Sequence, residues 1–316
     1  MNINHRVATI VVTITTAAAT IVAAPWANAT TTAGTSKNGT VVSGDAQVTA
    51  EVAALAKSRG AGVQDALEAY WTPERMKAAQ PDTQMPAVKA AAAKAADQGQ
   101  GQTVTATGPQ GAPERIAGTG STVAVTPSKI DQNVAPQSYY PDLPVGHPTA
   151  RTVGKVFFTL SGLDFVCSGS TVNTEGRATV WTAGHCLSGN GEFASNWCFV
   201  PNYVNGEAPF GIWCAYQLWT TVGWLYFGDF RYDVGAALMF GQFGYCIVDF
   251  LGGQGIAWNF PIGQYVFAFG YPQAPPFDGQ FLVAEQGWTY DGAFFYFSTP
   301  ETIFMFNEPA SSCCGW

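Results

Sequence analysis

The stretch Val180-Trp181-Thr182-Ala183-Gly184-His185-Cys186 places a histidine directly after a short apolar strand and directly before a cysteine. A general base must be held within hydrogen-bond reach of its nucleophile, and a histidine on a loose loop would not stay there. A strand expected over residues 178–183 leads into the turn, and Gly184 allows the turn to be tight and to expose His185. The pattern therefore favours a catalytic base over the alternative, a structural histidine beside a structural disulfide.

His185 is the only histidine of the three in the chain that lies where such a base is needed. His5 lies in the N-terminal leader, and His147 precedes the first strand of the expected domain. A zinc site is a poor alternative, because the adjacent His185 and Cys186 rarely bind one ion and the sequence has no Cys-x-x-Cys pair. We therefore expect neither a metal nor an organic cofactor.

Negative charge is concentrated in the later part of this 316-residue chain, whose formal net charge is −8. From Ala135 onward the sequence has four basic and thirteen acidic residues, and the aromatic residues gather after Ser138. An acidic, lysine-poor surface argues against nucleic-acid binding and suits a secreted hydrolase. We therefore expect no nucleic-acid partner.

Residues 1–29 have the form of a secretory signal peptide. A short basic start at His5 and Arg6 is followed by an apolar run over residues 7–24 and by the small-residue end Ala27-Asn28-Ala29. A transmembrane anchor is a weaker alternative, because four threonines interrupt a run that is barely long enough to span a bilayer. We expect a secreted, extracellular protein without a membrane partner after signal removal, in which disulfides can form.

Residues 30–140 are expected to form a propeptide or a disordered pro-region. The region is rich in Ala, Thr, Gln and Gly and almost free of aromatic residues, so we expect it to bury little core. Two pieces have helical character, residues 45–57 with Asp45 as the cap and residues 63–70, and an alanine-rich patch follows at residues 87–96. A disordered linker or surface stalk is the alternative.

Short apolar segments separated by Gly, Pro, Asn and Asp follow Gly154, without a long stretch of helical periodicity. This spacing alone predicts an antiparallel all-β domain, either a barrel or a sandwich. The expected strands cover residues 155–160, 165–168, 178–183, 197–200, 213–220, 234–240, 264–269, 280–284 and 294–298.

The histidine segment, with Cys167-Ser168-Gly169-Ser170 upstream of it, resembles the histidine loop of chymotrypsin-like serine proteases. The resemblance covers roughly residues 154–316 and is strongest for secreted bacterial trypsin-like peptidases of actinomycete type, related to glutamyl endopeptidases. Residues 70–76, Tyr-Trp-Thr-Pro-Glu-Arg-Met, are similar to the pro-segment of that group. Further segments that support the resemblance lie at residues 154–158, 195–197, 209–213 and 270–272.

The resemblance implies a peptidase domain over residues 141–316, built from two antiparallel β-barrels with the active site in the cleft between them. It also implies a disulfide between Cys167 and Cys186, which would tie the histidine turn to the preceding strand. Cys198 and Cys214 flank an expected hairpin and are candidates for a second bridge. The remaining cysteines leave an odd thiol, and their pairing stays open: Cys246, Cys313 and Cys314.

A serine protease also needs an aspartate that accepts the imidazole N–H, fixes the tautomer and stabilises the imidazolium as it forms. Asp233 fits this role, because it begins an apolar strand and follows His185 by 48 residues. Asp229 is the competitor, although its flanking residues do not lead directly into a strand. We assign the role to Asp233, with a solvated turn aspartate as the alternative.

The nucleophile is expected at Ser312, within Ala310-Ser311-Ser312-Cys313-Cys314-Gly315-Trp316. In the bacterial motif Gly-Ser-Ser-Gly-Gly-Pro-Trp this serine takes the nucleophile position, and the N–H groups of Ala310 and Ser312 would form the oxyanion hole. The three glycines of the motif are replaced here by Ala310, Cys313 and Cys314. In the family, the glycine at the position of Ala310 adopts a backbone conformation that a side chain disfavours. The family also continues beyond this point with strands that complete the second barrel, so we interpret that barrel as C-terminally incomplete and the C-terminus as truncated or altered.

The sequence thus predicts a secreted serine endopeptidase, made as a zymogen and acting as a monomer on protein or peptide substrates. Catalysis would use His185, Asp233 and Ser312 and an acyl-enzyme intermediate. The alternative from a different class is an inactive protease-like binding module that lacks a competent oxyanion hole, and a third reading is a fragment that does not fold. Substrate preference cannot be predicted, since most residues that would line the specificity pocket follow Ser312.

Overall fold

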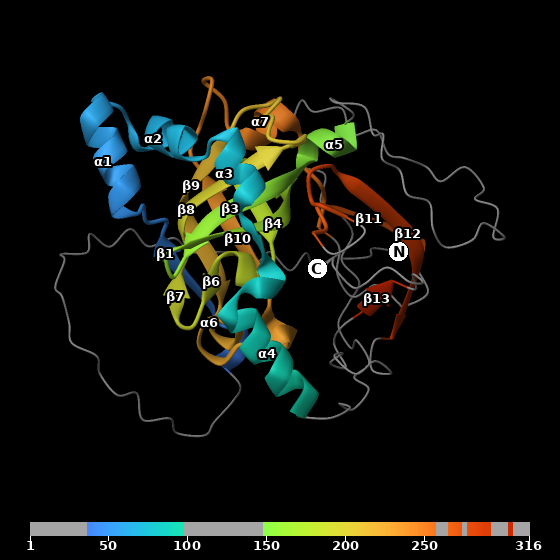
Figure 1. Cartoon of the computed structure of the whole chain (residues 1–316). Helices are drawn as coiled ribbons and strands as arrows, with labels where there is room; N and C mark the ends of the chain where they lie inside the picture. The colour runs from blue at the N-terminus through green and yellow to red at the C-terminus, as the bar shows by residue number, and fades with distance from the viewer. Residues whose placement is uncertain (1–36, 98–147, 257–264, 274–276, 292–302, 306–316) are drawn as a thin grey trace, which may run out of the picture. The chain divides into compact units, whose positions relative to one another are not determined.

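The computed structural model describes residues 37–97, 148–256, 265–273, 277–291 and 303–305 (Figure 1). Several features predicted from the sequence lie outside these ranges: the signal peptide, the strand at residues 294–298, and the candidate nucleophile Ser312 with Ala310.

Six antiparallel strands close into a barrel. Neighbouring strands follow the order β9, β10, β5, β4, β3 and β8, and β8 returns to β9 through the pairs Cys198–Cys214 and Phe199–Trp213. All six are predicted from the sequence, and the barrel confirms the all-β, chymotrypsin-type fold class. The strands are β3 (Val153–Leu160), β4 (Leu163–Val172), β5 (Thr179–Thr182), β8 (Ser195–Pro201), β9 (Trp213–Thr221) and β10 (Gly235–Met239).

Two more strands of the same sheet come from the N-terminal segment, residues 37–97. Strand β1 (Val41–Asp45) pairs antiparallel with the second half of β9, whose first residues pair with β8 instead. Strand β2 (Gln80–Pro81) pairs in parallel with Phe165 and Val166 of β4. Residues far upstream in the sequence are therefore part of the barrel sheet.

Four helices follow β1 in this segment, and β2 and the 3-10 turn η2 (Asp82–Gln84) lie between the third and the fourth. The helix expected at residues 63–70 is present, and the alanine-rich residues 87–96 lie within the fourth helix. The helix expected over residues 45–57 is wrong at its start, because Asp45 ends β1 and Thr49 takes the N-cap position. The helices are α1 (Ala50–Arg59), α2 (Val63–Tyr70), α3 (Pro73–Ala78) and α4 (Pro86–Asp97).

The remaining elements are short. Three strands, β11 (Tyr265–Gly270), β12 (Val283–Asp291) and β13 (Ile303–Met305), form a separate open sheet rather than a second closed barrel within the described residues. The other elements are η1 (Lys37–Gly39), α5 (Pro148–Thr152), η3 (Gly184–Cys186), β6 (Ser188–Gly189), β7 (Glu192–Phe193), α6 (Val222–Phe227), η4 (Phe230–Tyr232) and α7 (Ile247–Leu251).

The barrel wall at β3 is buried on both faces. Val156, Phe158 and Leu160 belong to the core inside the barrel, whereas Val153 and Phe157 belong to a second cluster shared with α1, α2 and α3. Successive residues of a strand point to opposite faces, so the two clusters lie on opposite sides of the same strand. All eight residues of β3 are consequently buried.

The N-terminal segment supplies the cover on the outer face. The Trp71 side chain packs on Phe157 with a ring-centroid separation of 5.4 Å, and its indole N–H donates to the Asn196 carbonyl at 2.8 Å. Leu67 and Met76 are buried in the same cluster. The expectation that residues 30–140 bury little core is wrong for residues 37–97, because Val52, Leu67, Trp71 and Met76 are buried in this cluster.

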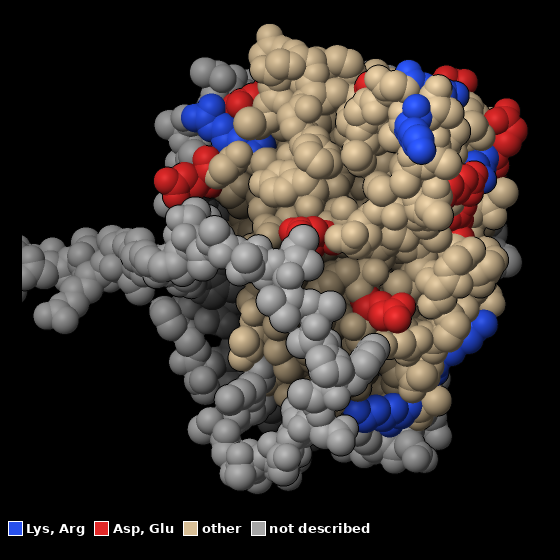
Figure 2. Space-filling view, turned by 90° about the vertical axis from the view of Figure 1, so that its left-hand side faces the viewer, with Lys and Arg blue, Asp and Glu red and all other residues tan. Residues whose placement is uncertain are grey.

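Charged side chains are sparse on the surface. Figure 2 shows a face on which Lys, Arg, Asp and Glu form small separate patches among uncharged residues, without a basic stripe among the described residues of that face. None of the helices in the described ranges is long and apolar enough to cross a membrane.

Candidate active site

His185 lies in the turn η3, between β5 and β6. The turn depends on a close approach of the chain to its neighbours. A Cβ atom at position 184 would lie 2.7 Å from Thr220 Oγ1 and 2.8 Å from Trp224 Cδ1, so only glycine fits there. The expectation that this turn exposes the histidine is wrong, since the His185 side chain is only 7% exposed.

Two disulfides hold the site's framework, and both join the cysteines named from the sequence. Cys167 and Cys186 tie η3 to β4, with their Cα atoms 6.0 Å apart, and Cys198 and Cys214 join β8 to β9 where the barrel closes. The ligand atoms of Cys167, His185 and Cys186 lie within 4.8 Å of one another. Both sulfurs are used in the disulfide, so this cluster has no thiolate to offer to zinc.

Asp233 binds the histidine at two points. Its Oδ2 lies 2.7 Å from His185 Nδ1, and its Oδ1 accepts the main-chain N–H of His185 at 2.7 Å. The structure does not bring the competitor Asp229 to the histidine, because that carboxylate accepts hydrogen bonds from Nε and Nη2 of Arg231. Two-point binding fixes both the ring and the backbone of the turn.

Strand β9 holds the loop that carries Asp233. The Thr221 hydroxyl donates to the carbonyl of Tyr232 at 2.6 Å, and the Thr220 hydroxyl donates to the carbonyl of Val234 at 3.0 Å. These bonds fix the main chain directly before and directly after the aspartate. The carboxylate is therefore placed by the barrel wall itself.

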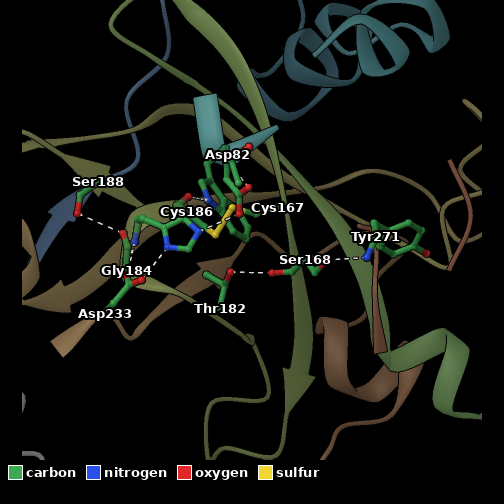
Figure 3. Close-up of a disulfide and its surroundings, with 12 residues drawn as sticks. Asp82, Cys167, Ser168, Thr182, Gly184, Cys186, Ser188, Asp233 and Tyr271 are labelled. Atoms are coloured by element: carbon green, nitrogen blue, oxygen red, sulfur yellow. Dashed lines mark hydrogen bonds and ion pairs between the residues drawn. A yellow bond between two sulfur atoms is a disulfide. The ribbon is translucent and has the colours of Figure 1, made fainter. Parts of the chain in front are cut away.

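The other ring nitrogen of His185 faces a second carboxylate that the sequence reasoning missed. Oδ2 of Asp82 lies 3.1 Å from Nε2 of His185. Figure 3 shows Asp82 and Asp233 on opposite sides of the site. Asp82 belongs to Pro81-Asp82-Thr83-Gln84, which reads locally as an ordinary polar turn and carries no signal of a role at the histidine.

The two carboxylates favour the charged form of the imidazole. Burial of the ring opposes that charge, but attraction and hydrogen bonding from Asp233, and then from Asp82, outweigh it and raise the pKa of His185 to about 10. Each ring nitrogen of His185 thus faces a carboxylate, an arrangement that stabilises the imidazolium.

Comparisons with known proteins identify relatives among the solved structures. The protease Anisep from Arthrobacter nicotinovorans is 40% identical over 46% of this chain and 66% of its own, with a TM-score of 0.44. A thermostable serine protease, AL20, from an extremophilic microorganism is 41% identical over 46% of this chain and 68% of its own, also with a TM-score of 0.44. A Glu endopeptidase is 15% identical over 48% of this chain and 67% of its own, with a TM-score of 0.39.

The chain thus spans about two thirds of the length of the proteases that it matches. No protein-family model matches it, and no curated protein matches it. Both matched proteins near 40% identity are described as proteases.

Proposed function

We propose that this chain, which belongs to the serine proteases, is a secreted serine endopeptidase made as a precursor. The observation that supports this most directly is the buried pair of His185 and Asp233, in which both carboxylate oxygens are engaged by the histidine residue. We extend the proposal to peptidases of actinomycete type related to glutamyl endopeptidases, on the sequence segments that resemble them. Specificity for a particular side chain is not part of the proposal.

In the proposed reaction His185 Nε2 takes the proton of the Ser312 hydroxyl, and Ser312 Oγ attacks the scissile carbonyl to form an acyl-enzyme. Asp233 accepts Nδ1–H, which leaves Nε2 as the basic nitrogen and stabilises the imidazolium when the proton arrives. The N–H groups of Ala310 and Ser312 stabilise the oxyanion. Water then hydrolyses the acyl-enzyme, and no metal or organic cofactor is required.

Two features support an extracellular location. The two disulfides, Cys167–Cys186 and Cys198–Cys214, suit an oxidising compartment. The leader over residues 1–29 has the three parts of a signal peptide. We propose that the protein is exported and that the signal is then removed.

Labelling with a fluorophosphonate probe tests the function. Labelling of the purified protein should disappear in Ser312→Ala and in His185→Ala, because both the nucleophile and its base are needed. Asp233→Asn should slow labelling by roughly 10³- to 10⁴-fold, since the orienting carboxylate sets the tautomer. Digestion of a denatured protein substrate by the same variants gives the second readout.

A folded protein that is not labelled would contradict the proposal. Binding of peptides without turnover would then favour the inactive binding module. The replacement of the motif glycines by Ala310, Cys313 and Cys314 supports that alternative. A cooperative thermal transition of the same sample separates a folded, inactive protein from one that does not fold.

A further inference from the structure

We propose that the N-terminal segment inhibits the site directly, with Asp82 as a carboxylate latch on the catalytic nitrogen of His185. The inference rests on the proposed function and specifies how that site is regulated. It assigns a role to a residue 103 positions upstream of the histidine that it touches.

The latch occupies the ring nitrogen of His185 that the proposed reaction uses. Asp233 takes Nδ1, so a serine hydroxyl that transfers its proton to the ring has to approach Nε2. The Asp82 carboxylate lies 3.1 Å from that nitrogen, at the distance of a hydrogen bond. Asp82 and a serine hydroxyl therefore compete for one atom.

Hydrogen bonds within the turn η2 orient the Asp82 carboxylate. Oδ1 of Asp82 accepts the N–H of Thr83 at 2.7 Å, and the Asp82 carbonyl accepts the N–H of Met85 at 2.8 Å. The turn η2 thus fixes both the side chain and the main chain of the residue, and leaves Oδ2 for the histidine. A side chain held in this way loses little further freedom when it binds.

The N-terminal segment is anchored to the barrel on both sides of Asp82. On one side, Gln80 and Pro81 pair with β4. On the other, the Met85 side chain is fully buried in the barrel core. Helix α4 then packs against β6, since the Cβ of Ala87 lies only 2.9 Å from the place where a Cβ on Gly189 would be. These contacts with the barrel lie before and after Asp82 in the chain, and they hold it at the histidine.

The Asp82 carboxylate stabilises a form of His185 that does not act as a base. An imidazolium with both N–H groups donating cannot accept the proton of a serine hydroxyl, so the histidine in this state is not a base. The groups that raise the pKa of His185, against burial of its ring, are Asp233 and Asp82 alone. Because Asp233 belongs to the catalytic pair, Asp82 is the added charge that stabilises the unreactive form.

Titration of the His185 ring by ¹⁵N NMR in the full chain tests the latch without relying on catalysis. Asp82→Asn keeps an oxygen for Thr83 N–H but removes the charge, and it should lower the pKa of His185 by about one to two units. Asp65→Asn removes an exposed carboxylate of the same segment and should leave the titration unchanged. His185→Gln assigns the signal.

Fluorophosphonate labelling of the same proteins separates the latch from the proposed function. Asp82→Asn and Asp82→Ala should be labelled about tenfold faster than the wild-type chain or Asp65→Asn. An unchanged His185 titration in Asp82→Asn overturns the latch. It is also overturned if all four proteins are labelled, and at the same rate. If no protein is labelled while the pKa still falls, the proposed function fails and the contact between Asp82 and His185 stands.

Discussion

Lys155 is the most unusual single residue outside the site. Its side chain is completely buried on β3, its ammonium donates to the Gly279 carbonyl at 2.7 Å, and it lies 4.8 Å from the Tyr203 ring centroid. Burial lowers the pKa of Lys155 to about 7, and the charge of Asp278 opposes this only in part. The folded protein therefore disfavours the charged lysine.

This arrangement predicts a pH dependence of stability. Between about pH 7 and the ordinary lysine pKa of about 10.5, the unfolded chain binds more protons at this residue than the folded chain, so folding becomes more favourable as pH rises. The wild-type protein should gain free energy of unfolding relative to Lys155→Met between pH 7 and pH 9, as measured by urea denaturation.

The comparison of these two proteins removes the opposite contribution of His185. The raised pKa of His185 gives stability that is present below about pH 6.5 and is lost as pH rises towards about 10. That residue is the same in both proteins, so its effect cancels. A stability difference that stays constant from pH 7 to pH 9 would show that Lys155 keeps an ordinary pKa.

At the scale of elements, β1 shows how closely the N-terminal segment fits the barrel. A Cβ on Gly44 would lie 2.6 Å from Cδ2 of Phe193, in β7. This contact is too short, and the Phe193 ring would have to move to relieve it. Gly44→Ala should therefore destabilise the protein by about 1–3 kcal/mol. Gly176→Ala is the matched control, because nothing lies within 4 Å of its added Cβ. Equal urea midpoints for the two variants would mean that β1 does not dock in this way.

The barrel strands could be predicted from sequence because their apolar segments are long and separated by turn residues. Strand β3 carried more information than that, since Val156, Phe157 and Phe158 are consecutive apolar residues, a pattern of strands buried on both faces. Such a strand requires a cover outside the barrel. The sequence does not say which segment supplies it, because docking of α1, α2 and α3 depends on a few side chains in a polar region.

The site was also predictable in part: the catalytic pair could be found from the sequence, and Asp82 could not. His185 and Asp233 lie in segments whose flanking strands and spacing are distinctive, and the structure brings them together. Asp82 lies in a polar turn and reaches the histidine through long-range contacts such as the pairing of β2 with β4, between residues more than eighty positions apart. Long-range contacts of this kind depend on the whole fold, so no local pattern could reveal the second carboxylate.

At the scale of the whole molecule, the N-terminal segment is both a cover for the barrel and the carrier of Asp82. It contributes two strands, β1 and β2, to the sheet and large buried side chains to both clusters, and burial of each such side chain contributes about 1.5–3 kcal/mol. The side chains are Val52, Leu67, Tyr70, Trp71, Met76 and Met85. A cut in the connecting chain removes none of these contacts.

We therefore expect the two pieces to stay together after cleavage between residues 98 and 147. A chain with a protease recognition sequence inserted near residue 120 should, once cut, elute from a sizing column in native buffer as one complex, and it should separate in denaturant. Trp71→Ala should weaken the complex, because it removes a side chain that is 1% exposed, whereas Tyr226→Ala removes one that is 62% exposed and should not. Separation of the wild-type pieces in native buffer would contradict this. Because the complex keeps Asp82 on His185, cleavage alone should not release the site, and release should require digestion of the bound segment.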